Sequence, residues 1–124
     1  MSNAFEHLSK IRPRTLREGV TARAVVGERM TLAVVDLAPD SVVPMHNHEN
    51  EQLGFVLQGS VTMQIAGGKR ELKAGDTYTI PSNVPHEATA GPNGATVVDV
   101  FAPLRADWEK LDRLDPFPPD WPQS

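Results

Sequence analysis

The sequence contains no cysteine, and this absence already limits its chemistry. Without thiols the chain can form no disulfide bond and offers no thiolate ligand, so a bound metal ion would need nitrogen and oxygen ligands. No apolar stretch reaches the roughly eighteen residues of a membrane span, and residues 1–4 lack the basic and apolar regions of a signal peptide. We therefore expect a cytoplasmic protein without a membrane partner.

Basic residues are also scarce. The 124 residues carry 12 Lys and Arg against 16 Asp and Glu, a net charge of −4, whereas a nucleic-acid-binding domain usually has a basic face. No nucleic-acid partner is therefore expected. A hydrophobic content of 40% allows one domain that buries roughly two thirds of its unfolded surface. We expect a single domain over residues 1–124, with a core of about 18–104 and a C-terminal helix and tail at 105–124.

Most of the chain has the alternating pattern of β-strands separated by glycine and proline turns. Strands are expected at residues 20–26, 30–37, 52–57, 61–66, 69–73, 77–80, 86–90 and 95–101. Eight or nine short strands of this kind predict an all-β jelly-roll sandwich or barrel. Only Arg105 to Leu114 has helical spacing, and the proline-rich tail that follows cannot continue a helix.

Three histidines have the spacing that a site for one metal ion needs. His46 and His48 are two residues apart, so both imidazoles point to the same face of an extended chain. His86 follows a later strand and a proline-fixed turn, from which a neighbouring strand could bring it to the same point. The pair alone would be weak support, because two histidines can equally be solvated or hydrogen-bonded.

The two segments together resemble the motifs of the cupins, G-x5-H-x-H-x3,4-E-x6-G and G-x5-P-x-G-x2-H-x3-N. In this chain the first reads His46-x-His48-x3-Gln52-x6-Gly59, and the second reads Gly75-x5-Pro81-x-Asn83-x2-His86-x3-Ala90. The resemblance implies a single-domain cupin jelly-roll β-barrel that binds one divalent metal ion per chain. The implied ligands are His46, His48, Gln52 and His86.

The chain departs from these motifs at positions that bear on its chemistry. Gln52 replaces the usual glutamate ligand, so three imidazoles and one amide would leave the full charge on a dication and favour a Lewis acid. Zinc, nickel, manganese and iron all suit such ligands. Glu51 is an alternative ligand, although its parity is opposite to that of Gln52. Pro39-Asp40 and Asn83 stand where the motifs have glycine, and asparagine tolerates a left-handed turn.

Alternation along two strands sorts their residues into an inner and an outer set. If Gln52 faces inward, Gly54 and Val56 do so as well, whereas Leu53, Phe55 and Leu57 face outward. These outward apolar residues need a cover, and we expect a homodimer. The same alternation places Val97, Asp99 and Phe101 on one face of the last strand. Burial of the Asp99 carboxylate would be costly unless it is paired or functional. A purely structural pairing, with a backbone group or an arginine, explains its position as well as a functional role does.

The stretch from Val98 to Trp108, together with the glutamine form of the first motif, resembles the KdgF group of cupins from pectin and alginate pathways. The resemblance implies an isomerase or tautomerase that converts 4,5-unsaturated monosaccharide uronates into their linear keto form. It also implies that Asp99 transfers a proton, that Arg105 binds the substrate carboxylate, and that Phe101 shapes the pocket. The expected small-molecule partner is a sugar acid.

Two further functions remain open. Some cupins are non-haem metal-dependent dioxygenases, although the missing carboxylate ligand argues mildly against that activity here. A non-catalytic module that binds a small molecule is the other alternative, and an aspartate in the pocket argues against it. The sequence predicts no cofactor besides the metal ion.

Overall fold

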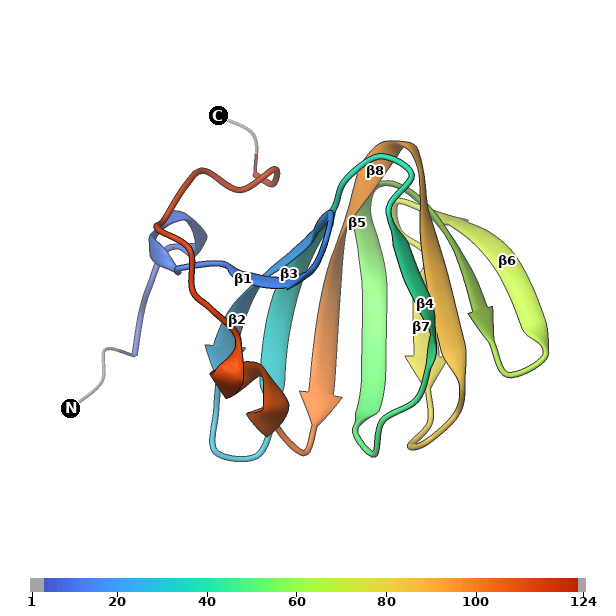
Figure 1. Ribbon diagram of the computed structural model, residues 1–124, viewed down its shortest axis with the longest axis horizontal. Helices are drawn as coiled ribbons and strands as arrows, with labels where there is room; N and C mark the ends of the chain where they lie inside the picture. Colours follow the sequence, from blue (N-terminus) through green and yellow to red (C-terminus); the bar gives the residue numbers. More distant parts are fainter. Residues whose placement is uncertain (1–3, 123–124) are drawn as a thin grey trace.

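The computed structural model describes residues 4–122, within which eight strands form one antiparallel sheet folded into two layers (Figure 1). The strands are β1 (Arg14–Arg17), β2 (Val20–Val26), β3 (Thr31–Leu37), β4 (Val42–His46), β5 (Glu51–Ile65), β6 (Gly68–Lys73), β7 (Thr77–Ile80) and β8 (His86–Ala102), and two short 3-10 helices flank them, η1 (Leu8–Lys10) and η2 (Ala106–Lys110). The predicted all-β jelly roll is confirmed. No helix in these residues is long and apolar enough to span a bilayer.

Two long strands, β5 and β8, take part in both layers. The first half of β5 pairs with β7 and with the second half of β8, whereas its second half pairs with β6 and with the first half of β8. One layer therefore has the order β1-β2-β3-β8-β5-β7, and the other has β4-β8-β5-β6. In Figure 1, β1 to β3 lie on one side of β8 and β5, and β6 lies on the other.

The prediction of separate strands at 52–57 and 61–66, and at 86–90 and 95–101, is wrong because each pair is continuous. The chain bends instead of breaking, since the β5–β8 register shifts between Val56 and Gln58 and again between Gly59 and Val61. Such irregularities let one strand turn from one layer into the other. At this bend a Cβ on Gly59 would lie 2.1 Å from the carbonyl oxygen of Gly94, so the close approach requires glycine.

The sequence pattern also missed β1 and β4. Strand β4 is mostly exposed and contains Pro44, so it lacks the alternation that marks a half-buried strand. The turn residues agree better with expectation, because Asn83 has a φ of 64° and Asp40 a φ of 62°. Both are left-handed conformations at positions where the motifs have glycine.

The core lies between the two layers and consists mainly of aliphatic side chains. Its members include Val20, Ala22, Val35, Leu37, Val56, Val61, Met63, Leu72, Ile80 and Val97. The predicted parity of β5 is confirmed, because Gln52 and Val56 are buried, whereas Leu53 is 48% and Phe55 40% exposed. Burial of these aliphatic groups supplies the main driving force for folding.

The C-terminal helix predicted at Arg105–Leu114 is wrong in length and type. Only the five-residue 3-10 helix η2 forms, in which the backbone N–H of Leu111 donates to the carbonyl of Trp108. Beyond it the backbone pairs with the N-terminal segment, because Arg113 bridges to Arg14 and the N–H of Leu114 donates to Pro13. These contacts satisfy the backbone groups that a longer helix would have paired internally. Trp108, within this 3-10 helix, packs into the core.

Candidate functional site

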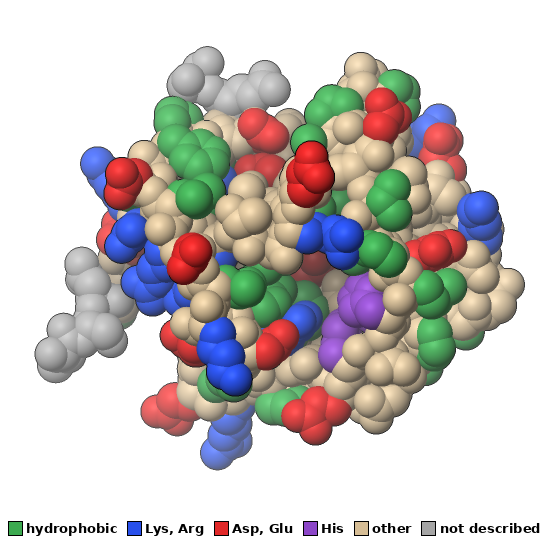
Figure 2. Space-filling model, in the orientation of Figure 1, with side chains coloured by type: hydrophobic (Ala, Val, Ile, Leu, Met, Phe, Trp, Pro, Cys, Tyr) green, Lys and Arg blue, Asp and Glu red, His purple; other side chains and the backbone are tan. Residues whose placement is uncertain are grey.

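Three histidines meet at one end of the cavity between the layers. His46 at the end of β4 is paired with His86 at the start of β8, and His48 lies in the loop that follows β4. The ring centroids of His46 and His86 are 4.3 Å apart, those of His48 and His86 4.9 Å, and those of His46 and His48 5.6 Å. Histidine side chains are visible in a hollow of the surface in Figure 2. Because one ring nitrogen from each lies within 4.8 Å of the others, the histidines are positioned to bind a metal ion.

Each histidine is held by a backbone carbonyl group near its own position in the chain. The Nδ1 atoms lie 2.7 Å from the oxygen of Pro44 for His46, 3.0 Å from that of Asn50 for His48, and 2.9 Å from that of Val84 for His86. A carbonyl oxygen only accepts hydrogen bonds, so each Nδ1 carries the proton. In a neutral ring this leaves the Nε2 lone pair free to bind a metal ion.

Burial keeps two of these rings neutral. It lowers the pKa of His48 and of His86 below the ordinary value, and the positive charge of Arg105 acts in the same direction on both. The loop that carries His48 is fixed as well, since its carbonyl accepts a 2.8 Å hydrogen bond from the N–H of Asn83. Metal ligands of this type need neutral rings in fixed orientations.

Gln52 places its side-chain oxygen beside the ring nitrogens of the three histidines. Its side-chain Oε1 lies 3.2 Å from Nε2 of His48, and both atoms are acceptors because the proton of His48 is on Nδ1. Two lone pairs that face each other without a proton between them are unfavourable, and a shared cation removes this conflict. The donor set of three imidazoles and one amide oxygen therefore fits a divalent ion. Glu51, the alternative ligand, is exposed, whereas Gln52 is buried.

Asp99 lies beside Gln52 and is almost completely buried. Burial raises its pKa to about 6, while hydrogen bonds from Tyr78 and Gln52 and the charge of Arg105 lower it. The hydroxyl of Tyr78 donates to Oδ1 of Asp99. The predicted inward position of this aspartate is thus observed, and its partners are side chains of the cavity wall.

Arg105 reaches the cavity from the segment after β8. Its guanidinium lies 4.8 Å from the ring centroid of Phe101 and 4.7 Å from that of Trp108, a spacing that allows cation–π attraction. Its Nε and Nη2 donate to the carboxylate of Asp107 at 3.0 and 2.9 Å, and these hydrogen bonds hold the pKa of Asp107 below its ordinary value. Arg105 is therefore already paired, and no pattern in the sequence predicted this pairing.

The segment that carries Arg105 is fixed by two earlier parts of the chain. The amide of Asn50 donates to the carbonyl of Pro103, and the N–H of Arg105 donates to the hydroxyl of Thr31 at 3.0 Å. Sequence reasoning missed Asn50, Asp107 and Tyr78. Of these, only Tyr78 had a visible signal, since alternation within β7 gives it the parity of the buried Ile80.

The cavity has a volume of about 480 Å³, within the range of small-molecule sites. One end carries the polar groups described above. The other end is lined by aliphatic side chains, among them Val20, Val35, Leu37, Val61 and Met63. The arrangement suits a small ligand with oxygen atoms at the polar end.

Comparison with protein families gives a match to the Cupin_2 family, described as "Cupin domain", over residues 33–101. Among curated proteins, the chain is 30% identical over 95 residues to the pectin degradation protein KdgF of Dickeya dadantii, an alignment that covers 75% of this chain and 86% of that protein. It is also 30% identical over 93 residues to the dimethylsulfoniopropionate lyase DddW of Ruegeria pomeroyi, covering 75% of this chain and 59% of the lyase.

The fold has close counterparts among solved structures. The structure of KdgF from Halomonas sp. superposes with a TM-score of 0.78 at 27% identity, covering 86% of this chain and 98% of the other. Nearly the whole of that protein therefore has an equivalent here.

Proposed function

Because the chain belongs to the cupin family and is a KdgF-like cupin, we propose that it is a metal-dependent enzyme that converts 4,5-unsaturated monosaccharide uronates into their linear keto form. The observation that carries this proposal is a buried carboxyl group, Asp99, which contacts the candidate ligand Gln52 inside a cavity of suitable size. The relative from Dickeya dadantii is named for pectin degradation, which supports a sugar acid as the substrate.

In this proposal His46, His48, Gln52 and His86 hold one divalent ion. Bound there, the ion supplies a Lewis acid that polarises substrate oxygens. The chain contributes three fixed imidazoles and an amide oxygen, and it provides no thiolate or ligating carboxylate within this set. Zinc, nickel, manganese and iron all remain suitable.

The reaction itself needs two proton movements and no oxidant. Opening the ring breaks the C1–O5 bond and removes the proton of the anomeric hydroxyl, and formation of the keto group adds a proton at C4. The number of electrons and atoms is unchanged, so one carboxyl group can accept the first proton and donate the second. Asp99 is the group to which we assign both transfers.

Arg105 and Phe101 complete the assignment. Arg105 binds the uronate carboxylate, because a planar guanidinium can donate two parallel hydrogen bonds to a carboxylate. In the structure the guanidinium of Arg105 binds the carboxylate of Asp107 instead. The substrate carboxylate would therefore displace Asp107 or bind the N–H groups of Arg105 that Asp107 leaves free. Phe101 forms an apolar wall beside the guanidinium and lowers the local dielectric.

The proposal is tested with a 4,5-unsaturated galacturonate or a close relative and protein loaded separately with each candidate metal. The readout is loss of the ultraviolet absorbance of the conjugated acid relative to the uncatalysed background. Activity above background with at least one metal is the expected result. If no metal gives a rate above background, the uronate reaction is excluded, and oxygen consumption with iron would then indicate a dioxygenase, whereas ligand binding alone would indicate a binding module.

The metal site is tested independently of activity. Elemental analysis of protein purified without chelator should give close to one metal ion per chain, and the His48→Ala, His86→Ala double variant should lose it. His7→Ala is the matched control, because His7 is an exposed histidine bonded only to nearby residues. Unchanged metal content in the double variant would contradict the proposed ligands.

A further inference from the structure

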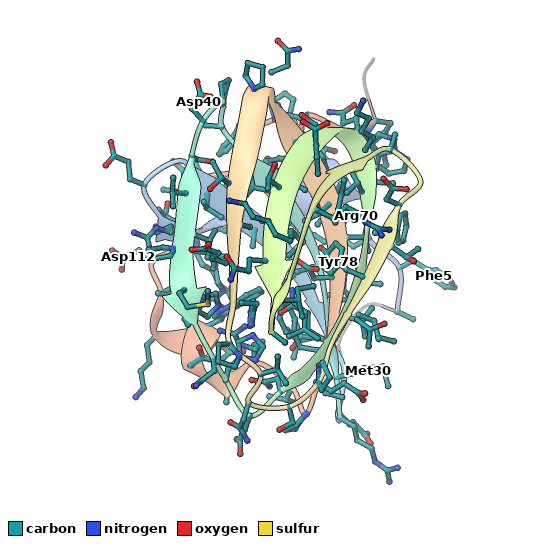
Figure 3. All side chains as sticks on the ribbon, turned by 90° about the vertical axis from the view of Figure 1, so that its right-hand side faces the viewer. Phe5, Met30, Asp40, Arg70, Tyr78 and Asp112 are labelled. Carbon is teal, nitrogen blue, oxygen red and sulfur yellow. The ribbon has the colours of Figure 1, made fainter. Side chains whose placement is uncertain are left out.

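Three inward-facing residues form a row across adjacent strands at the polar end of the cavity. Gly54 on β5 is directly opposite Tyr78 on β7 and directly opposite Asp99 on β8. Adjacent strands are about 4.8 Å apart, so the two outer members of this row are separated by the full width of the central strand. Tyr78 lies inside the fold in Figure 3.

The middle member of the row has no side chain, and the two outer members meet above it. A Cβ on Gly54 would lie 2.4 Å from Cζ of Tyr78 and 2.5 Å from Oδ1 of Asp99, both far inside van der Waals contact. Any other residue at position 54 would have to push the phenol and the carboxylate apart. The glycine is thus needed for a close side-chain approach, since its φ does not fall in the left-handed region.

The tyrosine hydroxyl uses this space to donate a hydrogen bond to Oδ1 of Asp99. Both side chains are buried, so neither can exchange its partner for bulk water. Gln52 donates to the same carboxylate. Together the phenol and the amide fix the plane of a carboxyl group that would otherwise be free to rotate about its χ2 angle.

We propose that Tyr78 is a positioning residue that holds Asp99 in the orientation required for proton transfer, and that the glycine at position 54 makes this contact possible. The catalytic role of Tyr78 rests on the proposed function, in which Asp99 transfers the protons. The contact itself is a property of the fold and can be tested without substrate.

Tyr78 is the single tyrosine of the chain, which makes the contact directly observable. Protein labelled with [ζ-13C]tyrosine should give one NMR signal, whose chemical shift reports on the hydrogen bond of the phenol. The Asp99→Asn variant should move this signal, whereas Asp112→Asn, at an exposed aspartate far along the chain, should leave it in place. A signal that does not respond to Asp99→Asn would overturn the inference whatever the enzyme activity is.

Activity supplies the second measurement. Tyr78→Phe keeps the ring and removes only the hydroxyl, so we expect it to fold, and we expect kcat to fall about tenfold or more with little change in KM. The loss should disappear when Asp99 is already Asn, because Tyr78 acts only through that carboxylate. The matched control is Thr79→Val, which removes an exposed hydroxyl from the same strand.

The outcomes separate this inference from the proposed function. Equal losses from Tyr78→Phe in the wild-type and Asp99→Asn backgrounds would indicate a merely structural hydroxyl and overturn the inference. An unchanged kcat in an active Tyr78→Phe variant would overturn it too. A wild-type protein without activity on unsaturated uronates would remove the catalytic role of Asp99 and with it this role of Tyr78, while the NMR signal would still decide whether the contact exists.

Discussion

Gln52 is the residue at which the site departs most clearly from the usual cupin motif, and its surroundings explain why an amide stands there. Its oxygen faces His48, and its nitrogen donates to Asp99. A glutamate could not donate that hydrogen bond, and it would place a second carboxylate beside a buried one, which is electrostatically unfavourable. The neutral amide therefore allows a carboxyl group to lie next to the candidate metal ligands.

Replacement of Asp99 by asparagine should separate proton transfer from metal binding. We expect Asp99→Asn to fold and to retain its metal ion, because the three histidines are unchanged. The rate should nevertheless fall on the order of a hundredfold or more, the usual contribution of a positioned proton-transfer group. Steady-state kinetics with parallel elemental analysis checks this, and an Asp99→Asn variant with wild-type kcat would exclude the assigned role.

Removal of Arg105 should act mainly on substrate binding. Because the guanidinium is assigned to the carboxylate in ground and transition states alike, Arg105→Ala should raise KM about tenfold or more and change kcat much less. Arg29→Ala, an exposed arginine in the turn between β2 and β3, is the control. A selective loss of kcat in Arg105→Ala would show that the arginine instead stabilises charge in the transition state.

Among the elements, the C-terminal tail packs over an arginine that is buried in the sheet. Arg23 on β2 has no exposed surface; its side chain forms a 3.1 Å ion pair with Asp36 on β3 and donates to the carbonyl of Phe117 at 2.7 Å. The ring of Phe117 covers the guanidinium at 4.7 Å. The proline-rich tail is thus a structural cover, which explains how an arginine is tolerated in a strand interior.

Loss of this arginine should destabilise the fold strongly. Arg23→Ala leaves the buried carboxylate of Asp36 without its partner and the tail without its anchor, so the free energy of unfolding should fall by about 3 to 5 kcal/mol. Urea denaturation measures this change. Arg70→Ala, at an exposed arginine on β6, should stay within about 0.5 kcal/mol of wild type. A similarly small effect for Arg23→Ala would mean that the ion pair contributes nothing net.

In the molecule as a whole, an apolar surface remains uncovered on the outer face of the layer that carries Gln52 and Asp99. Strand pairing places Val25, Leu32, Val100 and Leu53 side by side in one row across β2, β3, β8 and β5. Phe55 and Val98 lie in the next row. Four of these side chains, Val25, Leu32, Leu53 and Phe55, are at least 40% exposed, and a contiguous apolar patch of this kind favours association.

We therefore propose a homodimer that buries this face. Light scattering at micromolar concentration should give twice the chain mass, and Leu53→Glu should give a monomer because it places charge in the apolar row. Val42→Glu is the control, since Val42 is 47% exposed and lies on β4 in the other layer. A wild-type monomer at this concentration would rule the proposal out.

The fold class, most strands and the inward parity of Gln52 and Asp99 could be predicted from the amino-acid sequence, because alternation and turn residues are local signals. The sequence also marked His46, His48 and His86 through a spacing that reflects the strand geometry. Several side-chain contacts could be identified only in the folded chain: the Tyr78–Asp99 contact over Gly54, the pairing of Arg105 with Asp107, and the packing of the tail over Arg23. These contacts join residues through strand register and packing, which no local pattern encodes. For the same reason the helix expected after Arg105 gave way to backbone pairing with β1, and the expected strand breaks became bends.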